Sequence, residues 1–167
     1  MRMADDFLMH QLQAFAPRSI LAVGESAGAL VSGYSTRHPD CEVVHVGSRE
    51  AVATLISAPA TQRYDFGLTA GYLETVDKET GGVLIARLRD VQVKRLCVVV
   101  PDAEVPQKNN WTDAELTAFG LSFLERLQQG NVAYRIYGFD IGSYKKTPDW
   151  LNPRHWANPE RWNKDRW

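Results

Sequence analysis

An apolar run that leads into a glycine-bracketed turn is the feature that most constrains what this chain can fold into. Residues 19–23 (SILAV) precede the pentapeptide GESAG at residues 24–28, and small and apolar residues follow. This order is typical of a buried strand, a tight loop and a helix. Strand-like and helix-like segments keep alternating after it. The pattern predicts an α/β fold with a doubly wound, mostly parallel sheet of about five strands.

Local signals place the individual elements. The predicted strands are residues 19–23, 42–46, 64–68, 96–100 and 132–137, and the predicted helices are a first one ended by Pro17, then 26–37, 49–57, 83–91 and 112–130. The run of apolar residues at 96–100 indicates a strand covered on both faces. Thr112 and Glu115 have capping-box spacing, so we expect a helix from there to Gly130. The alternation at 132–137 predicts a strand near the sheet edge.

Composition limits the possible partners and surroundings. The chain has 167 residues, 44% of them hydrophobic, and a formal net charge of -1. That size fits one core, and the charge gives no reason to expect binding to nucleic acid or membrane by the chain as a whole. No signal-peptide core or apolar run of about 18 residues is found, which favours a cytoplasmic protein. Cys41 and Cys97 lie in apolar runs, where a buried thiol is expected rather than a disulfide.

The last part of the sequence has a different character, so we divide the chain into an α/β domain (1–143) and an extension (144–167). The extension is rich in proline, basic residues and tryptophan, with a tandem hexapeptide that repeats Trp and Asn-Pro; its tryptophans are Trp150, Trp156, Trp162 and Trp167. One interpretation is that the indoles pack onto the domain. The other is that the stretch from Trp150 to Trp167 forms a surface for a protein partner or single-stranded nucleic acid.

The GESAG loop supports two chemistries. Gly24-x-Ser26-x-Gly28 between a strand and a helix has the context of a nucleophile elbow, which makes Ser26 a candidate nucleophile and His155 its base. Asp65, Asp102 and Asp140 lie between them in the chain order of such a triad. Alternatively, Gly24 and Gly28 let the backbone approach a ligand at the switch point of the sheet. The histidines and cysteines show no metal-ligand spacing, so no metal site is predicted.

Residues 20–30 resemble the first motif of class I S-adenosylmethionine-dependent methyltransferases. Residues 43–48 (VVHVGS) are similar to their second-strand segment, residues 64–74 (YDFGLTAGYLE) to their fourth-strand motif, and residues 83–101 to the helix and strand after it. The whole chain, with its PDWLNP segment, is more closely similar to a family of short, uncharacterised bacterial proteins with that fold. The resemblance implies S-adenosylmethionine as a cofactor. It implies a site formed by Gly24, Glu25, Ser26, Gly28, Gly47 and Gly71.

The sequence also departs from the methyltransferase pattern. Ala22 stands where an acid is usual, Ser26 where a glycine is usual, and Gly47 where an acid usually binds the ribose hydroxyls. Losing that carboxylate removes an interaction worth about 1.5–3 kcal/mol. Only 17 residues separate Val46 from Tyr64, which predicts that one edge strand is missing. We therefore expect a non-catalytic binding or scaffold protein; the alternatives are a methyltransferase with an altered pocket and a serine hydrolase.

Overall fold

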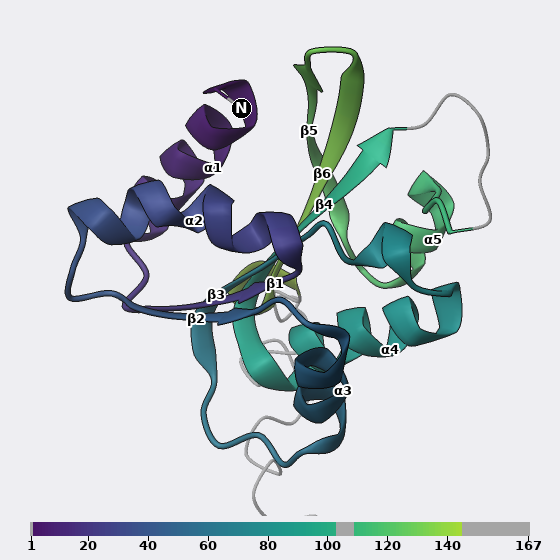
Figure 1. The fold of residues 1–167 in the computed structure, drawn as a ribbon, viewed down its shortest axis with the longest axis horizontal. Helices are drawn as coiled ribbons and strands as arrows, with labels where there is room; N and C mark the ends of the chain where they lie inside the picture. Colours follow the sequence, from purple (N-terminus) through teal and green to yellow (C-terminus); the bar gives the residue numbers. More distant parts are fainter. Residues whose placement is uncertain (1, 103–108, 145–167) are drawn as a thin grey trace, which may run out of the picture.

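The computed structural model describes residues 2–102 and 109–144, which form one sheet with helices on both faces (Figure 1). The α/β class predicted from the sequence is therefore confirmed. In chain order the elements are α1 (Arg2–Phe15), β1 (Ser19–Val23), α2 (Glu25–Arg37), β2 (Glu42–Val46), α3 (Arg49–Ser57), β3 (Tyr64–Ala70), the 3-10 turn η1 (Leu73–Thr75), α4 (Lys78–Arg87), the π-helical turn η2 (Leu88–Gln92), β4 (Val93–Asp102), α5 (Asp113–Ala118), β5 (Ser122–Gln129), β6 (Val132–Asp140) and α6 (Ile141–Tyr144).

The sheet has six strands in the order β2-β1-β3-β4-β6-β5. β1 to β4 are parallel, whereas β6 runs antiparallel to β4 and β5 antiparallel to β6. The predicted parallel arrangement holds for β1 to β4, and the structure corrects the strand count and adds an antiparallel hairpin. The order reverses at β1, which lies between β2 and β3. The carboxyl ends of β1 and β3 therefore form the switch point of the sheet.

Two apolar layers hold the sheet between helices. α1 and α2 cover one face, and α3, α4 and α5 lie on the other (Figure 1). β1 shows the alternation that this requires, because Ile20 and Ala22 belong to the layer under α1 and α2 while Leu21 and Val23 belong to the opposite layer. All four of these side chains are fully buried. The central strands are thus apolar on both faces, as the sequence of 96–100 predicted for β4.

The predicted helix over residues 112–130 is wrong beyond its first turns. The capping box of Thr112 and Glu115 is present and starts α5, but this helix ends at Ala118. Gly120 follows with φ 76°, a left-handed conformation that ends helices and favours glycine. Residues 122–129 then form β5, so their apolar residues at helical spacing belong to a strand.

Two further boundaries differ from the predictions. The helix expected over 83–91 begins earlier, at Lys78, because Oδ1 of Asp77 accepts a hydrogen bond from the Thr80 amide at 2.8 Å and caps it. It then continues into η2. The strand predicted near the sheet edge, 132–137, is β6, which lies next to the edge strand β5 as expected but continues to Asp140.

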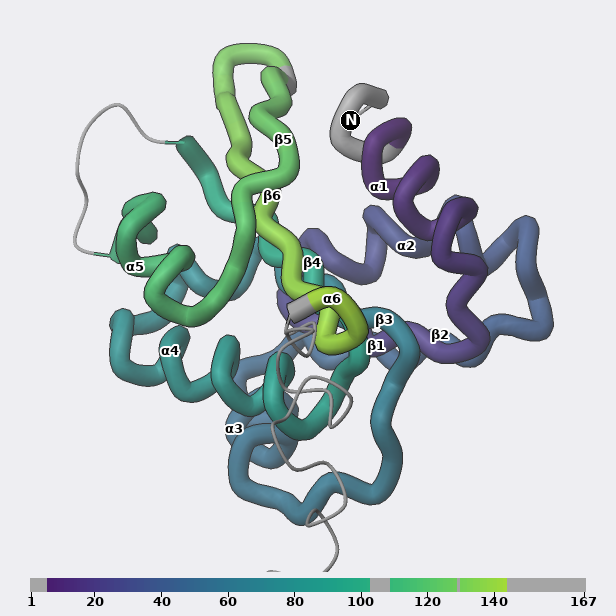
Figure 2. The backbone as a smooth tube through the Cα atoms, turned by 180° about the vertical axis from the view of Figure 1, so that it is seen from behind, coloured from purple at the N-terminus to yellow at the C-terminus, as the bar shows by residue number. Residues whose placement is uncertain are grey.

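The edge strands of the described sheet are β2 and β5. β2 follows α2 directly and connects to β3 through α3 alone, so no strand lies beyond it in the described part of the chain. This matches the prediction of a missing edge strand from the short 46–64 spacing. On the other side, the β5–β6 hairpin stands beside α1 (Figure 2).

The two cysteines are free thiols, as predicted; Cys97 is buried and Cys41 is half-buried. Among the described helices, none is both long and apolar enough to cross a membrane. Of the extension predicted over 144–167, Tyr144 ends α6, and residues 145–167, with His155 and the tryptophan repeat, lie outside the described residues. The two interpretations of the tryptophans remain predictions.

Candidate functional site

The predicted loop glycines meet at the carboxyl ends of β1, β2 and β3. Gly24 follows β1 directly with φ 106° and ψ 162° and is the N-cap residue of α2, a backbone conformation that is essentially restricted to glycine. Its Cα lies against the end of β3: a Cβ at this position would be 2.3 Å from the carbonyl oxygen of Ala70 and 3.0 Å from Cβ of Tyr72. The close approach that Gly24 permits is therefore to the chain's own backbone.

Gly71 has the matching role at the end of β3. Its φ is 75°, and a Cβ here would lie 2.6 Å from Oγ of Ser26 and 2.9 Å from the Ser26 amide nitrogen. The first turn of α2 thus packs onto the loop after β3. The loops after β1 and β3 interlock through two glycines with positive φ.

His45 is the third contributor to this arrangement. It lies near the end of β2, in register with Ala22 of β1, and its Nε2 is 2.9 Å from the carbonyl oxygen of Gly24. A Cβ on Gly28 would be 2.9 Å from Cε1 of the imidazole, and one on Gly47 would be 3.2 Å from the same atom. The imidazole therefore occupies the space beside both glycines. Sequence reasoning considered His45 only as a metal ligand and missed this role.

The structure brings together the six residues predicted around a cofactor. Gly24, Ser26 and Gly71 pack on one another, Gly28 and Gly47 both border His45, and Glu25 is exposed in the first turn of α2. At this position the helix dipole stabilises the negative charge of Glu25. The clustering of these residues was predictable, because loops after neighbouring parallel strands meet at one edge of the sheet.

The predicted hydrolase triad does not assemble around Ser26 from the described acids. Asp65 lies at the start of β3, where it accepts hydrogen bonds from the Arg18 amide at 3.0 Å and from Lys94 Nζ at 2.7 Å. Asp140 ends β6 opposite Arg95, near the start of β4. Both acids are therefore at the opposite end of the sheet from Ser26.

Asp102 is at the carboxyl end of β4 but is held in a basic cluster. It pairs with Arg126 at 2.6 Å and lies 3.3 Å from Nε of Arg135, without hydrogen-bond geometry in the second case. Arg135 also donates to the Trp111 carbonyl at 2.5 Å and pairs with Asp113. Its side chain is only 14% exposed. This cluster fixes α5 to the sheet. The carboxylate of Asp102 is occupied by two arginines and is not paired with a histidine among the described residues.

Sequence reasoning also missed a half-buried acid at this edge, Glu74 in η1. Burial raises the pKa of its carboxyl group, and Oε2 has no hydrogen-bond partner. Near the end of β3, five residues before Glu74, the Oγ1 atom of the fully buried Thr69 also has no hydrogen-bond partner among the described residues. An acidic residue in the loop after a buried strand was the available signal, but the sequence does not tell a half-buried Glu from an exposed one.

A metal ion and a methyl donor, the two groups considered from the sequence, require different residues at this site. Among the described residues, no group of three or more His, Cys, Asp or Glu side chains could hold a metal. For a methyl donor, the backbone amides at the start of α2 are suitable donors, since Gly24 makes no side-chain cap. The carboxylate for the ribose is lacking, because Gly47 stands at its position beside His45. The residues present do not fit a methyl donor.

Comparison with solved structures shows a methyltransferase-like fold. The chain is similar to 1,6-didemethyltoxoflavin-N1-methyltransferase from Burkholderia thailandensis, solved with S-adenosylhomocysteine bound: the TM-score is 0.54 and the identity 14%, over 82% of this chain and 76% of that one. It is similar to magnesium protoporphyrin IX methyltransferase (ChlM) from Synechocystis PCC 6803, solved with SAM bound, with a TM-score of 0.54 and 14% identity over 80% and 76% of the two chains.

A third structure is longer than this chain. TehB from Haemophilus influenzae matches with a TM-score of 0.49 and 12% identity over 79% of this chain, but only 61% of TehB is covered, and this likeness carries no argument. In sequence, no curated protein gives a significant match. The model of a family of unknown function, DUF6231, matches residues 2–167, and the chain belongs to that family.

Proposed function

We propose that this protein is a non-catalytic binding or scaffold protein built on a methyltransferase-like fold. The proposal rests on what lies beside the loop glycines. A Cβ on Gly24 would meet Ala70, and one on Gly71 would meet Ser26. His45 lies beside Gly28 and Gly47. At each of these four positions, the atoms that a Cβ would meet belong to this chain.

The chemistry of the site supports the same proposal. Gly47 itself offers the hydroxyls of a ribose no carboxylate, and each buried hydroxyl without a partner costs about 1–3 kcal/mol. Position 22 in β1 offers no acid either, since Ala22 is apolar and fully buried. Two ionised groups at this edge already have partners: Asp102 is bound to arginines, and Arg49 donates to the Thr75 carbonyl at 2.6 Å.

Calorimetric titration with S-adenosylhomocysteine tests the proposal. This ligand is the product form of the methyl donor and does not react. The absence of binding can therefore not be due to the absence of a methyl acceptor. We expect no saturable heat and no change in the thermal unfolding midpoint. A ligand at 100 times its Kd would add about 2.7 kcal/mol to the free energy of unfolding, which such a measurement detects. One-to-one binding in the micromolar range would overturn the proposal.

A methyltransferase with an altered pocket is the second candidate. Two observations favour it: the N-terminal amides of α2 are uncapped by any side chain, and Glu25 and Ser26 are exposed beside them. Both solved methyltransferases named above carry a bound cofactor or its product. Positive binding in the same titration would make this the preferred function, with Glu74 and the loop around Gly71 as the region to search for an acceptor.

The partner of a scaffold remains to be proposed from the extension. We propose that the stretch from Trp150 to Trp167 is the recognition segment or the packing segment predicted from its composition, and one deletion distinguishes the two. If removal of residues 150–167 leaves a stable domain that has lost binding to a partner, recognition is supported. If the shortened protein unfolds or aggregates, the packing role is supported.

A further inference from the structure

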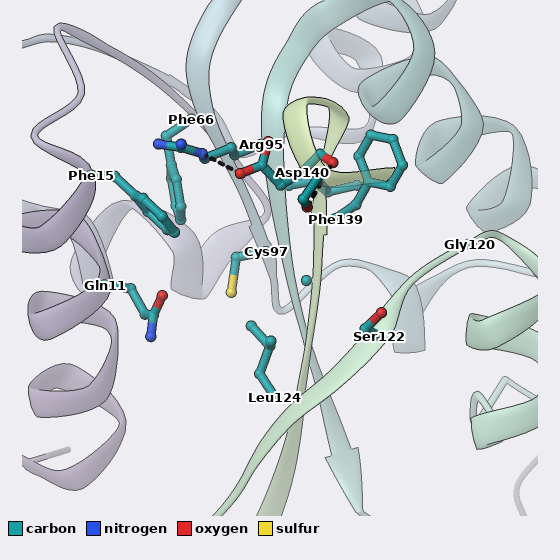
Figure 3. A pocket seen from close by; sticks show the side chains of 13 residues that line it. Gln11, Phe15, Phe66, Arg95, Cys97, Gly120, Ser122, Leu124, Phe139 and Asp140 are labelled. Atoms are coloured by element: carbon teal, nitrogen blue, oxygen red, sulfur yellow. Dashed lines mark hydrogen bonds and ion pairs between the residues drawn. The ribbon is translucent and has the colours of Figure 1, made fainter. Parts of the chain in front are cut away.

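A groove lies far from the glycine loop and is lined by residues of α1 and of the β5–β6 hairpin. Figure 2 shows these two elements side by side. It has a volume of about 360 Å³ and lies over the amino-terminal half of β4, at the opposite end of the sheet from Gly24. In Figure 3, Phe15 and Phe66 line it on the side of α1, Cys97 lies in the middle, and Ser122 and Leu124 come from β5. This volume is in the range of small-molecule pockets.

The groove follows from a row of small residues across three strands. Cys97 of β4 is the register partner of Gly138 of β6, which in turn is the partner of Ser122 of β5. Side chains of neighbouring partners share a face of the sheet, so this row forms a low floor. Leu124 leans over Gly138, since a Cβ on that glycine would be 2.7 Å from Cδ1 of Leu124. The hollow is therefore built into the strand register.

One end of the groove is aromatic and cationic at the same time. The rings of Phe15 and Phe66 have centroids 6.1 Å apart. The guanidinium carbon of Arg95 lies 4.1 Å from the Phe15 ring centroid, in stacking range. Arg95 pairs with Asp140 through Nε, at 2.8 Å. Its terminal amino groups make no hydrogen bond within the described part of the chain, which leaves them available as paired donors.

The surroundings of Arg95 carry an excess of positive charge. An adjoining cavity of about 530 Å³ is also lined by Arg95 and Asp140 and adds Arg18, Lys94 and Asp65. Lys94 is paired with Asp65, and the Arg18 side chain has no partner among the described residues. Three cations thus face two carboxylates. A ligand with one negative charge would balance this end of the groove.

We propose that this groove binds a small carboxylate with an apolar body, the carboxylate on Arg95 and the body between Phe15, Phe66 and Leu124. A guanidinium recognises a carboxylate through two parallel hydrogen bonds, and here its face is fixed by the Phe15 ring. The apolar body covers the thiol of Cys97 and the half-exposed Leu124. The proposal does not depend on whether the glycine loop binds a methyl donor, since the two sites are at opposite ends of the sheet.

Titration of the full-length protein with 1-naphthoate tests this inference, with 1-naphthalenemethanol as the uncharged counterpart. We expect one site for 1-naphthoate, at least tenfold weaker binding of the alcohol, and ligand-induced shifts of the Cys97 and Gly138 amides in nuclear magnetic resonance spectra. No binding at millimolar concentration, or equal binding of both compounds, would overturn the proposal. Shifts confined to residues outside the groove would do the same.

Two variants locate the site, each with a matched control. Ser122→Trp fills the groove from an exposed position and should abolish binding of both compounds, whereas Gln128→Trp, on the same strand, should not. Arg95→Met should remove the tenfold preference for 1-naphthoate, and Arg126→Met, an arginine at the far end of the sheet, should keep it. If Arg95→Met fails to fold, Ser122→Trp still shows whether the compounds bind in the groove. Undiminished binding by Ser122→Trp would contradict the assignment.

Discussion

Alanine substitution at two of the loop glycines separates a structural role from a ligand-binding role. Gly24→Ala places a side chain at φ 106° and ψ 162°, which costs about 1–3 kcal/mol in strain. Its Cβ would lie 2.3 Å from the Ala70 carbonyl oxygen. Neither atom can rotate away, because one is a Cβ and the other a backbone oxygen, so the strands must move apart. Overpacking of this kind costs about 1–3 kcal/mol. We expect a total loss of about 4 kcal/mol in the free energy of unfolding.

Gly28→Ala is the matched control in the same loop. It lies inside α2, where alanine is favoured over glycine by about 1 kcal/mol. Its Cβ would meet only the His45 ring, at 2.9 Å, and this exposed side chain can turn away. We therefore expect Gly28→Ala to stay within about 1 kcal/mol of wild type.

Urea denaturation measures both variants, and an unchanged slope with a shifted midpoint identifies a change in stability. For a chain of this size, a loss of about 4 kcal/mol lowers the thermal midpoint by roughly 8–16 °C. The reasoning is refuted if Gly24→Ala stays within about 1 kcal/mol of wild type. Equal losses in both variants would also contradict it, because the two glycines would then have the same role.

Other predictions follow from single groups. Arg135→Met removes a guanidinium that is only 14% exposed and leaves Asp102, 20% exposed, without this partner, which should cost about 3 kcal/mol. Arg126→Met, with a side chain 63% exposed, should cost less than about 1 kcal/mol in the same urea assay. Burial raises the pKa of Glu74 above its ordinary 4.5, so its ionisation disfavours the folded state; Glu74→Gln should gain stability relative to wild type as the pH rises from about 4 to about 7, and a constant difference would contradict this. Burial raises the pKa of Cys97 to about 12, so a water-soluble thiol reagent should modify Cys41 in the native protein and reach Cys97 only on unfolding, as mass spectrometry would show.

The parallel half of the fold could be predicted from the sequence because its signals are local. Apolar runs of strand length, a glycine turn after β1 and the short spacing after β2 each depend on neighbouring residues only. The β5 segment shows where this fails. Its apolar residues fit helical spacing as well as a strand, and Gly120 decides between them by ending α5. Interpreted as a helix stop, that glycine would have ended the predicted helix before residues 122–129 and left them to be assigned as a strand.

The content of the candidate site could be predicted only in part. The resemblance to methyltransferases implied a site of six loop residues, and these residues lie after the adjacent parallel strands β1, β2 and β3. What fills the space beside them depends on long-range pairing, such as the contact of His45 with Gly28 and Gly47. The groove beside Arg95 depends in the same way on the register that aligns Cys97 with Gly138. Neither contact has a sequence signature.

The central claim is that the glycine loop serves the fold and does not hold a methyl donor. The most direct measurement is a nuclear magnetic resonance titration of the full-length protein with S-adenosylhomocysteine, following the amides of Gly24, Gly28, Gly47 and Gly71. The account predicts that these four signals do not move at any ligand concentration up to millimolar. Saturable shifts of all four would show a ligand at the switch point and contradict the account.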